Sequence, residues 1–168
     1  MEIENQNEPV MKRPTFLVVL SVFSLISISS GLLSSILGLI SGPLQEYQVD
    51  EIIAQNMSGV TQLQEMGEVY WSEITLKILN LIKYTNANFY MDRLINFGAY
   101  AIGLNGVIFM WKGRKLGFHL YIVYNLIALI SIYASAPASE IPSFYFILFG
   151  IISSLFIFMY SRNLRFMK

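Results

Sequence analysis

Residues 15–40 read TFLVVLSVFSLISISSGLLSSILGLI, and no aspartate, glutamate, lysine or arginine interrupts them. A helix that crosses a bilayer needs about 20 consecutive apolar residues. This stretch therefore predicts a membrane-spanning helix with length to spare. A secretory signal peptide cleaved near Ser41 is the less favoured interpretation, because its apolar part would be only about 7–15 residues long.

Three more uncharged, apolar stretches follow at 94–111, 116–134 and 143–160. Inside hydrocarbon every backbone amide must be paired within the protein, so such stretches become helices. The chain is 55% hydrophobic and 13% charged, whereas soluble domains are about 25% charged. We expect an all-α, polytopic membrane protein, with a four-transmembrane-helix bundle. Residues 1–14 would form a cytoplasmic tail and 15–168 a single membrane domain, with a helical extracytoplasmic insertion at 41–93 between the first two spans.

The basic residues predict the orientation of the spans. They cluster before the first span, between the second and third, and after the fourth, as Lys12, Arg13, Lys112, Arg114, Lys115, Arg162, Arg165 and Lys168. With four spans, all three clusters lie on one side of the membrane, and an excess of lysine and arginine marks the cytoplasmic side. Both termini are therefore expected in the cytoplasm, and the segments 41–93 and 135–141 outside.

The segment 41–93 is the only long stretch outside the predicted spans. We expect one helix over 44–57, ended by Ser58-Gly59, and a second, amphipathic helix over 69–84 that lies near the outer surface. The segment is too short to build a core of its own. Its pattern leaves open whether 69–93 continues into the second span.

Small residues recur along the first span. Ser24, Gly31 and Gly38 are spaced by seven residues, and Ser27 and Ser34 follow the first two by three. This spacing places all five on one helix face, and small residues allow membrane helices to approach closely. We expect a packing face toward the protein's own spans. Docking onto a partner subunit and a serine-lined ion path are the alternatives.

Two amides, Asn105 and Asn125, fall deep within the second and third predicted spans. In a tight antiparallel hairpin they would lie at the same depth. An amide facing lipid would be expensive, so we expect the two side chains to hydrogen-bond to each other. The alternative is that one of them lines an internal cavity and belongs to a functional site.

Other polar and aromatic residues lie near the predicted membrane interfaces. His119 is the only histidine, and it is either a titrating group or simply a hydrated interfacial residue. Aromatic residues near the span ends, such as Tyr145 and Tyr160, are typical of an interfacial belt. The chain has no cysteine, which excludes disulfides and thiolate chemistry.

Two motifs carry a family resemblance. Lys12-Arg13-Pro14-Thr15-Phe16-Leu17 leads into the first span, and Met110-Trp111-Lys112-Gly113-Arg114-Lys115-Leu116-Gly117-Phe118-His119-Leu120-Tyr121 joins the second and third. Together they resemble small, uncharacterised four-span inner-membrane proteins of Bacteroidota, of the flavobacterial type. The resemblance implies a bacterial inner (plasma) membrane and no particular activity.

The expected function is association within a membrane. The sequence holds no catalytic, cofactor-binding, metal-binding or nucleic-acid-binding motif, so we expect a non-enzymatic protein without a cofactor. Its expected partners are the lipid bilayer and another membrane protein or a second copy of the chain. It would act as a small subunit or accessory protein of a membrane complex. The alternatives are an oligomeric small-solute transporter or channel and, less favoured, a membrane enzyme.

Overall fold

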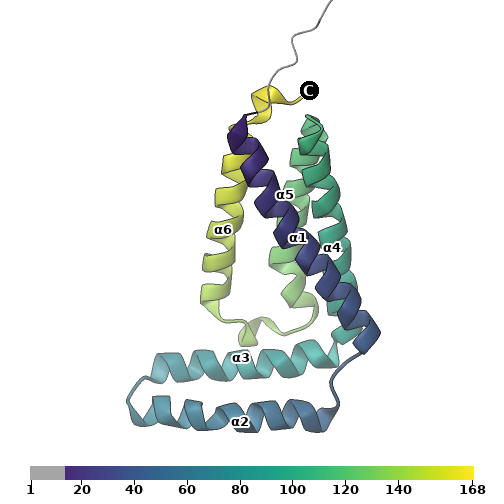
Figure 1. The fold of residues 1–168 in the computed structure, drawn as a ribbon. Coiled ribbons are helices and arrows are strands. Elements are labelled where there is room, and N and C mark those ends of the chain that lie inside the picture. The colour runs from purple at the N-terminus through teal and green to yellow at the C-terminus, as the bar shows by residue number, and fades with distance from the viewer. Residues whose placement is uncertain (1–13) are drawn as a thin grey trace, which may run out of the picture.

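The computed structural model describes residues 14–168, so all but the last residue of the predicted cytoplasmic tail lies outside the described residues. Six α-helices follow one another, and the described residues contain no strand (Figure 1). The helices are α1 (Thr15–Ser41), α2 (Glu46–Glu65), α3 (Val69–Ala87), α4 (Phe89–Trp111), α5 (Lys115–Ile130) and α6 (Ser143–Ser161). Short 3₁₀ turns occur at Ser131–Ala134, Ala138–Glu140 and Leu164–Phe166.

Four of these helices are long and apolar enough to cross a membrane, which confirms the all-helical prediction and its four candidate spans. They are Thr15–Ser41, Phe89–Trp111, Lys115–Ala134 and Ser143–Ser161. The uncharged stretch predicts a second span that begins at residue 94, but the helix begins at Phe89. The first turn of this helix accommodates Asp92, because a helix N-terminus favours a negative charge.

Glycines bring α4 and α5 into backbone contact. A Cβ on Gly117 would overlap the backbone at Gly106 O and Met110 N, and one on Gly106 would lie 2.9 Å from Tyr121 N. Close approach of this kind is how small residues hold membrane helices together. The α4–α5 hairpin is therefore closed by backbone packing.

The packing face of α1 differs in part from the predicted one. Gly31 lies against the ring of Tyr100 and Gly38 against Arg93, both on α4, and Ser24 is buried. Ser34 is exposed, however, so this part of the prediction is wrong. Positions three and four residues along both lie on the same side of a helix. The buried positions of α1 include Ser21, Ile28 and Ser35, each three residues before one of Ser24, Gly31 and Gly38. The helix face that packs inward is therefore the one on this side of the glycines.

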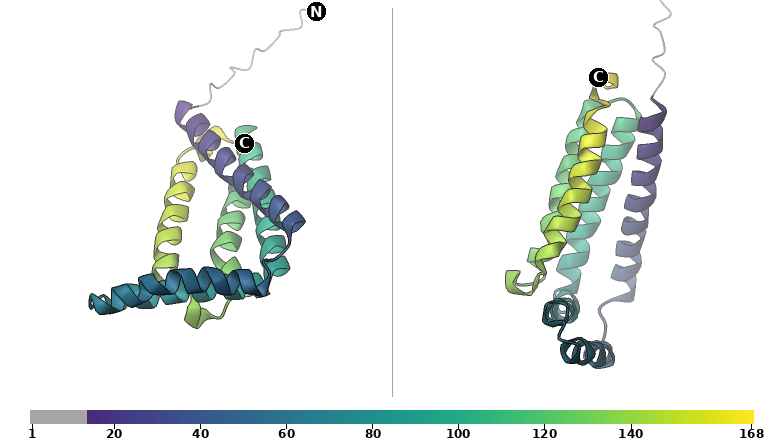
Figure 2. Two further views of the ribbon diagram at one scale, coloured as in Figure 1. Left: turned by 60° about the horizontal axis from the view of Figure 1, so that its bottom comes forward. Right: turned by 90° about the vertical axis from the view of Figure 1, so that its left-hand side faces the viewer.

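Helices α2 and α3 form an antiparallel pair that lies across one end of the bundle (Figures 1 and 2). The predicted break at Ser58-Gly59 is wrong, because α2 continues to Glu65. A single glycine costs a helix only about 1 kcal/mol, and a Cβ added at Gly59 would meet no atom of the described residues within 4 Å beyond its own stretch of helix. The turn comes at Gly67 instead, whose φ of 80° lies in the region that glycine favours.

Asparagines hold the end of this pair that adjoins α1 and α4. The Asn86 side chain accepts a hydrogen bond from Leu44 N at 2.8 Å and donates one to Leu44 O at 3.0 Å. Asn88 alone separates α3 from α4, and its Nδ2 donates to Ser135 O at 2.9 Å. The chain therefore turns a corner at Asn88, and α3 and the second span are separate helices.

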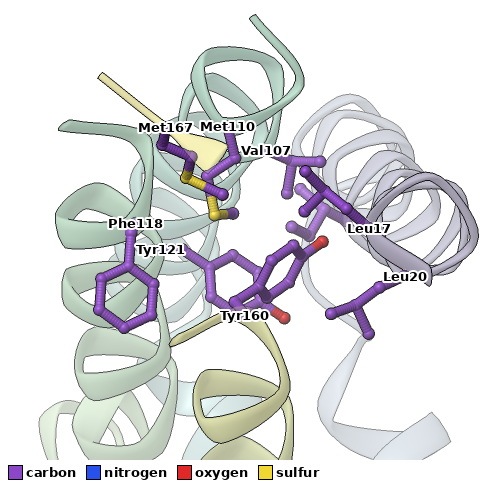
Figure 3. Packing of buried hydrophobic residues seen from close by; sticks show 9 residues of the cluster. Leu17, Leu20, Val107, Met110, Phe118, Tyr121, Tyr160 and Met167 are labelled. Carbon is purple, nitrogen blue, oxygen red and sulfur yellow. The ribbon is translucent and has the colours of Figure 1, made fainter. Parts of the chain in front are cut away.

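The opposite end of the bundle holds the apolar core and the chain's C-terminus. Side chains from α1, α4, α5 and α6 meet there, with Tyr121 and Tyr160 at the centre (Figure 3). Lys168 N donates to Gly113 O at 2.7 Å, and Lys115 N donates to Lys168 O at 2.9 Å. The C-terminal residue is thus held against the α4–α5 turn.

Candidate functional site

A cavity of about 430 Å³ lies among α1, α4, α5 and α6. It extends from the middle of the bundle to the end that α3 covers, where Thr85 contributes to its lining. Its wall combines polar and aromatic side chains. The polar lining residues include Ser24, Ser27, Asp92, Asn96, Asn125 and Ser131, and the aromatic ones include Phe23, Tyr100, Tyr121, Tyr124, Tyr145 and Phe149.

Tyr100, Tyr121 and Tyr124 line the cavity, and Tyr160 continues this row of tyrosines behind Tyr121 without lining it. The ring centroids of Tyr160 and Tyr121 are 4.8 Å apart, those of Tyr121 and Tyr124 are 5.7 Å apart, and those of Tyr124 and Tyr100 are 6.0 Å apart. Glycines on α4 and α1 make room for two of these rings, because a Cβ on Gly103 would lie 2.7 Å from Tyr124 and one on Gly31 would overlap Tyr100.

Ser24 closes the inner end of the cavity. Its Oγ accepts a hydrogen bond from the Tyr160 hydroxyl at 3.0 Å and lies 3.4 Å from the Tyr121 hydroxyl. All three side chains are buried, and Tyr160 is 0% exposed. Because the three residues belong to α1, α6 and α5, this hydroxyl cluster joins three helices at one point.

A second polar network surrounds the end of the cavity near α3. Asp92 Oδ1 accepts hydrogen bonds from Asn96 Nδ2 at 3.1 Å and from Ser135 Oγ at 3.3 Å. Ser131 Oγ lies 3.3 Å from Asn96 Oδ1, to which it donates. These contacts connect the first turns of α4 to the 3₁₀ turn after α5, and they place a carboxylate at the cavity wall.

The structure does not bring the two predicted amides together, so their predicted pairing is wrong. Asn105 is exposed and donates to Ala101 O at 2.9 Å, whereas Asn125 is buried and donates to Tyr121 O at 2.8 Å. Equal depth in a hairpin does not determine the direction in which a side chain points. Each amide instead donates a hydrogen bond to a backbone carbonyl of its own helix. Asn125 lines the cavity, as the alternative interpretation of an intramembrane amide allowed.

His119 lies apart from the cavity. Its side chain is exposed, and its Nδ1 is 3.1 Å from Lys115 O, one turn earlier in α5. The residues that sequence reasoning missed are the tyrosines. Tyr160 and Tyr145 were assigned to an interfacial belt, but Tyr160 is fully buried and Tyr145 lines the cavity. Four-residue spacing of Asp92, Asn96 and Tyr100 along one face of α4 was the available signal.

Comparison with protein-family models, with curated proteins and with solved structures finds no match to this chain. The cavity and the distribution of charge are therefore the features from which a function can be inferred.

Proposed function

We propose that the protein is a multi-pass protein of a bacterial inner membrane that binds a small solute in the cavity among its spans, in the manner of a small-solute transporter. The polar cavity is the observation that carries this proposal. Polar groups within spans are costly and usually face a cavity or another polar group. A cavity of about 430 Å³ falls within the roughly 300–1,000 Å³ typical of ligand sites.

The charge distribution supports an orientation with both termini in the cytoplasm. The exposed Lys112, Arg114, Lys115, Arg162, Arg165 and Lys168 gather at the end of the bundle that holds the C-terminus (Figure 1). Every acidic residue in the described part of the chain lies toward the other end, within 46–140. A surplus of basic residues on one face is the pattern that marks the cytoplasmic side.

Labelling of single cysteines tests this orientation, and the cysteine-free chain suits the experiment. In intact bacterial cells with a permeable outer membrane, we expect an impermeant maleimide to label Glu65→Cys, at the exposed end of α2. Lys168→Cys should be labelled only after the inner membrane is opened. Labelling of Lys168→Cys in intact cells would reverse the proposed orientation.

Two neighbouring serines of α6 test whether the cavity is open to solutes. Ser153 lines the cavity, whereas Ser154 is exposed on the outside of the bundle. In lipid nanodiscs, Ser153→Cys should react with iodoacetamide at least about tenfold faster than Ser154→Cys, because thiolate forms in a hydrated cavity but is suppressed in hydrocarbon. Equal rates for the two variants would contradict a solute-accessible cavity.

Association with another membrane protein, as a small subunit or accessory protein, is the second candidate, and α6 favours it. Only 6% of the most apolar part of α6 is buried, against 28% in each of the other three candidate spans. Its outward face includes the exposed Ile147, Ile151 and Phe158. A partner that co-purifies in stoichiometric amount from native membranes, together with an unreactive Ser153→Cys, would favour association over solute binding.

A further inference from the structure

We propose that the cavity selects a monovalent organic cation with an apolar body, an inference that rests on the proposed solute-binding function. Its charge would lie at Asp92, and its apolar body would lie along the tyrosines toward Ser24. Among residues 14–168, Asp92 is the one charged residue that lines the cavity. A carboxylate at the wall of a cavity among apolar helices favours a positive charge and disfavours a negative one.

The geometry around Asp92 leaves the carboxylate available to a ligand. Both hydrogen bonds that the described residues make to its side chain end on Oδ1, so Oδ2 keeps its capacity to accept another. The side chain of the adjacent Arg93 packs against Gly38 and Phe89. The Arg93 guanidinium lies 5.3 Å from the ring centroid of Phe89, and its buried Nε has no hydrogen-bond partner in the described part of the chain.

The aromatic lining gives the rest of the ligand its expected character. Asp92, Asn96 and Tyr100 lie on one face of α4, and eight residues of helix place Tyr100 about 12 Å further along the axis. Beyond Asp92 the wall includes several aromatic rings, among them Tyr100, Tyr124 and Phe149. Aromatic faces stabilise organic cations and also cover apolar groups. The cavity therefore combines one negative charge with an aromatic lining.

Inorganic cations fit this lining less well. Hard cations such as Ca²⁺ take about six to eight oxygen ligands, usually with several carboxylates. The described residues contain no group of three or more histidine, cysteine, aspartate or glutamate side chains that could hold a metal ion. One carboxylate at one end of the cavity, with aromatic and aliphatic side chains further along the wall, matches an ammonium group on an organic body.

Asp92 also has a structural interpretation, which the experiment must separate from ligand binding. Its place in the first turn of α4 suits the helix dipole, and its bond to Ser135 helps to fix the connection that follows α5. If Asp92 has only a structural role, replacing it should weaken the binding of all solutes alike. If Asp92 recognises a positive charge, replacing it should weaken the binding of cations only.

The test uses two probes of the same shape, phenyltrimethylammonium and the neutral tert-butylbenzene. Each is titrated into the Ser153→Cys protein in zwitterionic nanodiscs, and its binding is measured as protection of the cysteine from iodoacetamide. Nanodiscs without protein correct for partitioning into lipid. We expect phenyltrimethylammonium to protect at a concentration at least about tenfold lower than tert-butylbenzene, as a desolvated charge pair provides.

Asp92→Asn should remove this preference and leave the affinity for tert-butylbenzene within about twofold, whereas Asp92→Glu should retain it. Glu140→Gln is the matched control, since Glu140 accepts a hydrogen bond from Asn80 at the same end of the molecule and does not line the cavity.

If the Ser153→Cys protein binds both probes equally, the cation proposal is overturned and solute binding stands. An unreactive Ser153→Cys overturns solute binding itself. The comparison of the two probes on the protein with native Asp92 decides the matter even if Asp92→Asn fails to fold.

Discussion

Adding one methyl group at Gly117 is expected to destabilise the protein by about 1–3 kcal/mol, as overpacking does, and a valine there is expected to prevent folding. The cause is the contact of α4 with α5, where a Cβ on Gly117 would overlap the backbone at Gly106 O and Met110 N. Backbone atoms cannot turn aside as a flexible side chain can, so the two helices would have to separate.

Gly98→Ala provides the matched control for Gly117→Ala. Gly98 also lies in a candidate span, but a Cβ added there would have no neighbouring atom within 4 Å. Alanine is favoured over glycine in a helix by about 1 kcal/mol, so this change should leave the free energy of unfolding equal or higher. Unfolding in detergent, followed by circular dichroism, measures both variants. A similar effect of the two changes would mean that the hairpin is not closed by glycine contacts.

Tyr160→Ala is expected to cost about 3–5 kcal/mol, the range for removing a large buried aromatic side chain. Tyr160 is 0% exposed, packs against Tyr121 and donates to Ser24. Because α6 is otherwise poorly buried, this residue should provide much of the attachment of α6 to α1. Tyr160→Phe keeps the ring and loses only the hydrogen bond, so it should cost about 1 kcal/mol.

Phe158→Ala is the control for Tyr160→Ala, because Phe158 lies two residues earlier on the same helix and is 61% exposed. Its removal should change stability by less than about 1 kcal/mol. Titration of the protein with a denaturing detergent, monitored by tyrosine fluorescence, gives the order of the three variants. If Phe158→Ala proves as harmful as Tyr160→Ala, the outward face of α6 is covered by a partner, and the second candidate function gains support.

The sequence was sufficient to predict the candidate spans because hydropathy is a property of each stretch alone. It also indicated that the glycines of the first span pack closely, and Gly31 and Gly38 both lie against α4. It misplaced Ser34 because helical spacing cannot choose between faces three and four residues apart. That choice depends on the angle at which α1 crosses α4, which is a property of two helices together.

The candidate site was harder to predict for the same reason. Asn105 and Asn125 were paired from their depth alone, and their directions turned out to differ. Tyrosine at the end of a span is typical of an interfacial belt, so nothing in the sequence marked Tyr160 as buried. The cavity forms where four helices fail to fill the space between them, and no single stretch of sequence contains that information.

The corner at Asn88 makes α3 a lever. With 19 residues and a rise of 1.5 Å per residue, α3 extends about 28 Å from that corner. Since Asn88 is the only residue between α3 and α4 and is bonded to Ser135 O, we expect α3 to move with the second span. A change of about 10° in the tilt of α4 would then displace the far end of α3 by about 5 Å, given that length. Trp71 lies at that far end with 55% of its surface exposed, so its fluorescence would give an amplified optical signal of motion inside the bundle.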